Sequence, residues 1–82
     1  MEEKNSVITY MCIGNGYQIN PDKIKIAKEY KDGTATVVME SENTYDVLKT
    51  YWMALFYELQ TSGRYNYDET NKVFVRRESV NA

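Results

Sequence analysis

The stretch that decides the fold is residues 45–60, which read YDVLKTYWMALFYELQ. With a rotation of about 100° per residue, as in an α-helix, its large apolar side chains form one stripe. The centre of this stripe consists of four residues: Leu48, Trp52, Leu55 and Leu59. Its flanks carry five more apolar residues: Tyr45, Val47, Tyr51, Ala54 and Phe56. We therefore predict one long amphipathic helix from about Thr44 to Gln60, capped by residues 41–44 and ending at Gly63.

The apolar arc of this helix is wider than contact with a single sheet needs. Either a C-terminal hairpin wraps one flank, or the helix makes a second contact with a target or with another copy of the chain. On the opposite side, Met53 and Tyr57 are four residues apart among polar neighbours, so they touch. Single exposed apolar residues are common, but methionine and aromatic residues are enriched at interfaces. We interpret this pair as a candidate binding hot spot.

A short β-hairpin is predicted near the start of the chain. Residues 7–13 are rich in β-branched and aromatic side chains, which is typical of a strand. Asn15-Gly16 follows, a dipeptide favoured in two-residue hairpin turns, and residues 17–19 return as a second strand. This strand must stop near Pro21, which lacks the amide hydrogen that a sheet needs. Residues 1–6 are predicted to be a disordered tail.

A second hairpin is predicted from the alternating pattern of residues 23–31 and 34–41. Asp32-Gly33 is its two-residue turn, so Lys31 pairs with Thr34. Counting back from this turn places four residues on the inner face of the first strand: Ile24, Ile26, Lys28 and Tyr30. Lys28 does not fit an apolar face. Either it reaches out to solvent from an edge strand, or a β-bulge shifts the register.

The chain after the helix reads as a third hairpin, with strands in residues 64–67 and 72–77 around a turn at residues 68–71. The order is therefore strands, one helix and strands again, which is typical of the α+β class. We predict a single domain covering residues 7–82. Its antiparallel sheet has about four to six short strands in hairpins and packs against one long amphipathic helix.

The tyrosine and histidine contents of the chain favour a binding function over a catalytic one. Eight of the 82 residues are tyrosine and none is histidine. Tyrosine combines a large apolar ring with a polar tip, which suits recognition surfaces, whereas histidine is the usual proton-transfer group near neutral pH. Cys12 is the only cysteine, and we expect it to be an inert core thiol within the first strand. We therefore expect a non-enzymatic binding protein with no catalytic residues, cofactor or metal.

The C-terminal hairpin offers a second candidate binding surface because it interleaves cations with aromatic rings. Its candidate partner-binding residues are Arg64, Tyr65, Tyr67, Arg76 and Arg77. Aromatic rings stack on bases and cations pair with phosphates, so binding of a nucleotide or nucleic acid is the alternative function. The formal net charge of −2 is too balanced for a general nucleic-acid binder. A structural role for the same side chains is the other interpretation.

The composition also bears on the cellular location. A single cysteine suits a reducing compartment, and the first six residues, MEEKNS, do not resemble an export signal. No apolar run approaches the roughly 20 residues that a membrane-spanning helix needs. We expect a cytoplasmic protein that does not interact with membranes.

The layout of the chain resembles the small proteins with which phages and mobile elements inhibit bacterial defence systems, the anti-CRISPR class among them. The likeness rests on size, the lone cysteine, the strand at residues 36–39, the connector Glu40-Ser41-Glu42-Asn43, the helix, and the strand at residues 72–75. It implies an inhibitor that blocks a host defence protein or nuclease in the bacterial cytoplasm. The chain is not strongly acidic, so the resemblance does not extend to imitation of DNA, and it assigns no residue a role.

Overall fold

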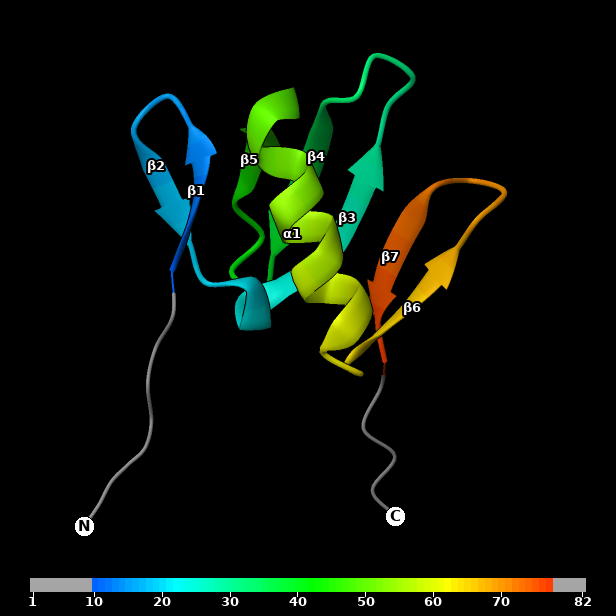
Figure 1. Ribbon diagram of the computed structural model, residues 1–82. Helices are drawn as coiled ribbons and strands as arrows, with labels where there is room; N and C mark the ends of the chain where they lie inside the picture. Colours follow the sequence, from blue (N-terminus) through cyan, green and yellow to red (C-terminus); the bar gives the residue numbers. More distant parts are fainter. Residues whose placement is uncertain (1–9, 78–82) are drawn as a thin grey trace, which may run out of the picture.

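The computed structural model describes residues 10–77, and this part of the chain forms seven short strands, one 3₁₀ turn and one α-helix (Figure 1). The elements before the helix are β1 (Met11–Gly14), β2 (Tyr17–Ile19), η1 (Pro21–Lys23), β3 (Ile24–Glu29), β4 (Ala35–Met39) and β5 (Thr44–Val47). The helix and the elements after it are α1 (Lys49–Thr61), β6 (Tyr65–Asp68) and β7 (Val73–Arg76). The predicted tail at residues 1–6 and the predicted start of the first strand at Val7 lie outside the described residues.

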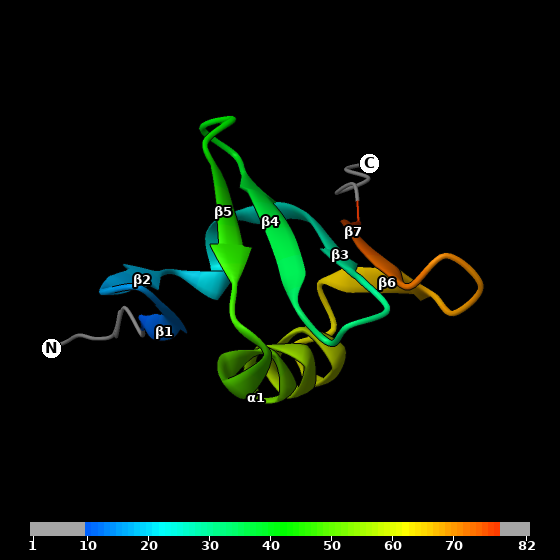
Figure 2. The same cartoon turned by 90° about the horizontal axis from the view of Figure 1, so that it is seen from above.

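Five of the strands form one antiparallel sheet in the order β5-β4-β3-β7-β6, and β1 pairs with β2 in a separate hairpin. Helix α1 lies across one face of the five-stranded sheet, and no described element covers the other face (Figure 2). The β1–β2 hairpin flanks the helix on one side, and the β6–β7 hairpin flanks it on the other (Figure 1). The predicted α+β class, with an antiparallel sheet packed on one helix, is confirmed.

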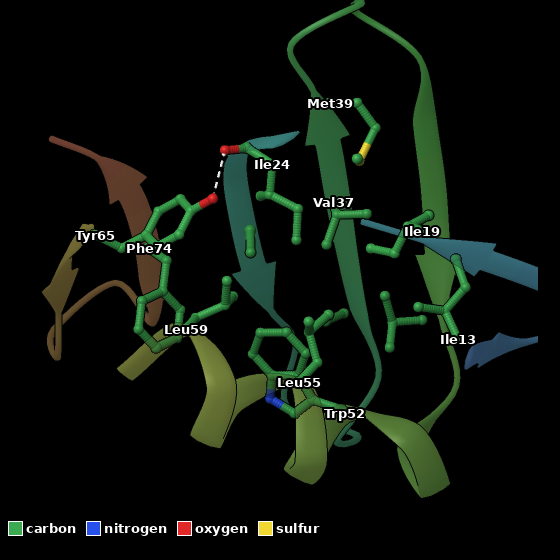
Figure 3. Packing of buried hydrophobic residues seen from close by; sticks show 13 residues of the cluster. Ile13, Ile19, Ile24, Val37, Met39, Trp52, Leu55, Leu59, Tyr65 and Phe74 are labelled. Atoms are coloured by element: carbon green, nitrogen blue, oxygen red, sulfur yellow. Dashed lines mark hydrogen bonds between the residues drawn. The ribbon is translucent and has the colours of Figure 1, made fainter. Parts of the chain in front are cut away.

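The core lies between α1 and the sheet. The predicted stripe supplies Trp52, Leu55 and Leu59, all buried, and these side chains point toward Ile24 and Val37 of the sheet (Figure 3). The flanking hairpins close both ends of this core. Ile13 and Ile19 enter from β1 and β2, whereas Tyr65 and Phe74 enter from β6 and β7.

Part of the wide apolar arc of the helix is explained by contact with the C-terminal hairpin. Phe56 lies on the flank of α1, and its ring centroid is 5.1 Å from that of Phe74 and 5.2 Å from that of Tyr67. Both pairs have the edge-to-face geometry that aromatic rings prefer. Phe56 is thus covered within the chain itself, whereas Tyr51 and Ala54 of the predicted arc are exposed.

The prediction that the helix starts near Thr44 is wrong, because residues 44–47 form β5. These residues alternate, with Val47 buried and Thr44 and Asp46 exposed, and the strand pairs with β4. Residues 40–43 turn the chain between the two strands, with the Met39 amide donating to the Asn43 carbonyl at 2.8 Å. Pairing with β4 therefore outweighs the local helical pattern. Helix α1 begins at Lys49 without a side-chain cap, and its predicted end before Gly63 is confirmed.

The predicted register of the second hairpin is also wrong, because its loop is one residue longer than a two-residue turn. The Tyr30 amide donates to the Thr34 carbonyl at 2.8 Å, so residues 31–33 form the loop and Glu29 pairs with Ala35. The Asp32 carboxylate accepts hydrogen bonds from the Thr34 hydroxyl and amide, which lower its pKa below the ordinary value.

A β-bulge between Ile24 and Ile26 changes which residues of β3 face the core. Ile24 and Ala27 are buried, whereas Ile26, Lys28 and Tyr30 are exposed. The bulge is one of the two explanations offered for Lys28, and it removes the misfit. The inner-face positions predicted for Ile26 and Tyr30 are wrong for the same reason, since a shift of one residue sends side chains to the opposite face.

Two expectations for the predicted first strand are corrected, because β1 begins only at Met11 and its alternation directs Ile13, not Cys12, into the core. Cys12 was expected in the core, but it is exposed, and its sulfur is 3.8 Å from the side-chain nitrogen of Gln18. Tyr10 is exposed just before the strand begins.

In residues 10–77, no helix has the length and hydrophobicity that a membrane crossing requires.

Gly14 fixes the β1–β2 hairpin against the start of α1. Its φ is +107°, and a Cβ built on it would lie 2.4 Å from Cγ of Leu48. We expect Gly14→Ala to lower the free energy of unfolding by about 2–4 kcal/mol, through backbone strain and overpacking. Gly16 is the control, because its φ is +81° but nothing lies within 4 Å of its Cβ position. Gly16→Ala is expected to cost only about 1 kcal/mol.

Urea unfolding followed by Trp52 fluorescence measures both variants. Equal losses of stability in Gly14→Ala and Gly16→Ala would contradict the close approach of Leu48 to Gly14.

Candidate functional site

Met53 and Tyr57 lie on the outer face of α1, on the side away from the sheet. Their exposed fractions, 78% and 67%, are the highest of any large apolar residue in the described part of the chain. They are four residues apart and therefore adjacent on the helix surface. The prediction that this pair faces outward is confirmed.

The surroundings of this pair carry little charge. Only Lys49 and Glu58 are charged within α1. Five further residues of the helix are exposed and uncharged: Thr50, Tyr51, Ala54, Gln60 and Thr61. Solvent-facing sides of helices normally carry charged residues, whereas the centres of protein interfaces are depleted of them. We call Thr50, Met53, Ala54 and Tyr57 the outer face of α1.

Tyr65 is not part of an exposed surface, which corrects its assignment as a partner-binding residue. It is 7% exposed, and its hydroxyl oxygen is 2.6 Å from the carbonyl oxygen of Pro21. The same oxygen is 2.9 Å from the carbonyl oxygen of Ile24 (Figure 3). Burial raises the pKa of this phenol, so it remains a neutral donor. Tyr65 thus ties β6 to the chain around η1.

Arg76 belongs to the same structural cluster, which corrects its assignment to a binding surface. Its guanidinium donates to the carbonyl of Asp22 and to the Tyr65 hydroxyl, the latter at 3.2 Å. It also lies 3.6 Å from the carboxylate of Glu40 and 5.7 Å from the Tyr65 ring centroid. With these contacts in place, Arg76 is not arranged to receive a phosphate.

Of the remaining candidates on the C-terminal hairpin, one packs against the core and two are exposed to solvent. Tyr67 is half-buried, with its ring centroid 4.5 Å from that of Phe74. Arg64 and Arg77 are exposed neighbours, joined by a backbone hydrogen bond from the Arg77 amide to the Arg64 carbonyl at 2.9 Å. Arg64 forms an ion pair with Asp22. The seven predicted partner-binding residues therefore do not form one site.

Three tyrosines gather beside the β1–β2 hairpin: Tyr10 and Tyr17 are exposed, whereas Tyr45, predicted on the flank of the helix, is half-buried on β5. The ring centroids of Tyr17 and Tyr45 are 5.5 Å apart, with the planes inclined at 50°. A cavity of about 480 Å³ opens next to Tyr10 and Tyr45 and reaches Met39. Which side of such short strands is covered depends on the position of β5, and the sequence pattern had assigned that segment to the helix.

The open face of the sheet carries a small apolar strip. Ile26 pairs with Val38 on one side and with Val75 on the other, and all three side chains point away from α1. Ile26 and Val75 are exposed and Val38 is half-buried. The alternation of residues 73–76, with Phe74 buried, is the sequence signal that would have indicated this strip.

The described residues provide no grouping of three or more histidine, cysteine or acidic side chains that could hold a metal ion. The chain matches no protein-family model, and no significant match to a curated protein or a solved structure is found.

The structural role of Arg76 is tested against its neighbour Arg77. We expect Arg76→Ala to lower the free energy of unfolding by about 1–3 kcal/mol, because it leaves the Tyr65 hydroxyl and the Asp22 carbonyl without a donor. Arg77 is exposed and bonds only to Asn66 through its side chain within the described residues, so Arg77→Ala should change stability by less than about 0.5 kcal/mol. Urea denaturation distinguishes the two, and similar losses would show that Arg76 is not the structural member of the pair.

Proposed function

We propose that this chain is a non-enzymatic binding protein that engages a protein partner through the outer face of α1. The observation that carries the proposal is the exposure of Met53 and Tyr57, 78% and 67%, on a helix whose only charged residues are Lys49 and Glu58. Burial of a methionine and a tyrosine in a partner's groove would supply the apolar contact that binding hot spots require.

The fold does not explain why these two residues are apolar. Trp52, Leu55 and Leu59 already fill the space between the helix and the sheet, and Met53 and Tyr57 do not belong to this buried core. A polar residue at either position would keep the helix equally well and improve solubility. Helices that present an apolar face to a partner commonly insert it into a groove.

The expected partner is a protein rather than a nucleic acid. Binding to phosphates requires cations, and the outer face of α1 offers none at its centre. The nucleotide alternative based on the C-terminal hairpin loses two residues, because Tyr65 and Arg76 are engaged within the chain. Within our proposal the protein acts as an inhibitor of phage or mobile-element type, covering a surface of a host defence protein or nuclease in the bacterial cytoplasm.

The experiment compares two double variants of matched chemistry. Met53→Gln/Tyr57→Gln removes the apolar groups from the outer face and retains good helix formers. Ile26→Thr/Val75→Thr removes apolar groups from the open sheet face and retains β-branched side chains. Each immobilised protein is used to capture partners from nuclease-treated bacterial lysate, and affinities for the captured protein are then measured with purified components.

The wild type and the sheet variant should bind the same protein, whereas the helix variant should bind it at least about tenfold more weakly. Equal binding by the helix variant would refute the placement of the surface, and capture that disappears after nuclease treatment would refute a protein partner. Light scattering adds one outcome: a dimer that becomes monomeric only in the helix variant would identify another copy of the chain as the partner.

A further inference from the structure

A cleft is lined by residues 28–31 and 70–72, from the two ends of the β3–β4 and β6–β7 connections that lie side by side. Both loops project from the same end of the sheet (Figure 1). The volume of the cleft is about 500 Å³, within the range of small-molecule sites. The side chains that matter for its chemistry are Lys28, Tyr30, Lys31, Thr70, Asn71 and Lys72. The two loops are held together by a hydrogen bond from the Glu29 amide to the Lys72 carbonyl at 2.9 Å. The cleft is therefore bounded by backbone that the sheet fixes.

The lining of the cleft is cationic. Three lysines and one carboxylate, that of Glu29, line it. No ion pair between described residues involves any of the three lysines. The Lys28 ammonium is 3.3 Å from the Asn71 carbonyl oxygen, a contact that uses one of its three hydrogens. Donors remain on all three lysines for an anion.

Asp32 and Asp68 are not among the residues that line the cleft. Asp32 accepts the hydroxyl and amide of Thr34, and Asp68 accepts the amides of Thr70 and Asn71 together with the Asn71 side chain. These bonds lower the pKa of both carboxyl groups, so they stay ionised at neutral pH. They form a negative border around the cationic cleft without entering it.

An aromatic ring stands beside the cations. Tyr30 is 43% exposed, and its ring centroid is 6.0 Å from the Lys28 ammonium. Lys28 and Tyr30 are two residues apart in an extended chain, so they face the same side of the sheet. A planar group stacked on this ring would lie next to the lysines, where a phosphate attached to it is neutralised.

We propose that this cleft binds a small molecule that combines a phosphate group with a planar ring, the chemistry of a mononucleotide. Lys31 and Lys72, assisted by Lys28, hold the phosphate, and the Tyr30 ring stacks on the base. The negative border formed by Asp32, Asp68 and Glu69 disfavours a long nucleic-acid strand, which would have to cross it. The cleft is lined by none of the residues of the outer face of α1, so the two proposals stand independently.

The test follows backbone amide signals by NMR while adenosine monophosphate, adenosine or inorganic phosphate is added to the full chain. Adenosine monophosphate should shift signals of residues 28–31 and 70–72, more strongly than either of its parts, and added salt should weaken the effect. Lys31→Ala combined with Lys72→Asn should weaken binding at least about tenfold. Asparagine is chosen at position 72 because it tolerates the positive φ of 58° there.

Lys25→Ala is the matched control. Lys25 lies on β3, as Lys28 does, but it forms an ion pair with Glu42 and does not line the cleft. Lys25→Ala should leave the affinity for adenosine monophosphate unchanged. Tyr30→Leu should weaken binding of adenosine monophosphate without changing the response to inorganic phosphate. The proposal is overturned if adenosine monophosphate leaves the cleft signals unmoved at millimolar concentration, if the double variant binds as well as the wild type, or if phosphate alone binds as tightly as the nucleotide.

Discussion

Burial of one face of a five-stranded sheet by a single helix is the constraint on which the rest of the structure depends. The 13 residues of α1 extend about 20 Å, similar to the width of five strands, but a helix is only about 10 Å thick. The inner stripe of Trp52, Leu55 and Leu59 fills the middle, and the sheet remains open on both sides of it. The separate β1–β2 hairpin closes one side, and the β6–β7 edge of the sheet itself packs against the helix on the other, so Ile13 and Phe74 both join the core.

Because the inner stripe and the flanking hairpins form the core, the outer face of α1 is not needed to stabilise the fold. The hairpins are fixed by contacts elsewhere: Gly14 against Leu48 at one flank, and the Tyr65–Arg76 cluster at the other. Residues that the core does not need are free to serve recognition. The same reasoning applies to the cleft between the two loops, because Lys31 and Lys72 lie beyond the ends of the strands and Lys28 is exposed on β3.

The sequence was sufficient to predict the fold class and the buried stripe of the helix, because Trp52, Leu55 and Leu59 recur with a clear helical period. It failed where long-range pairing competes with local pattern, as in residues 44–47, which fit either the start of the helix or a strand. It failed also at β3, since neither a three-residue loop nor a bulge has a distinct signature. Met53 and Tyr57 were located correctly because they lie opposite the stripe, whereas Tyr65 and Arg76 were misassigned because residue type alone does not reveal their partners.

The central claim is that α1 uses separate faces for folding and for recognition. The most direct measurement is the free energy of unfolding of Met53→Gln/Tyr57→Gln beside that of Leu55→Ala, both determined by urea denaturation. If the faces are separate, the outer variant stays within about 0.5 kcal/mol of the wild type while Leu55→Ala loses about 2–5 kcal/mol. A loss of several kcal/mol in the outer variant would show that Met53 and Tyr57 stabilise the fold, and it would contradict the account.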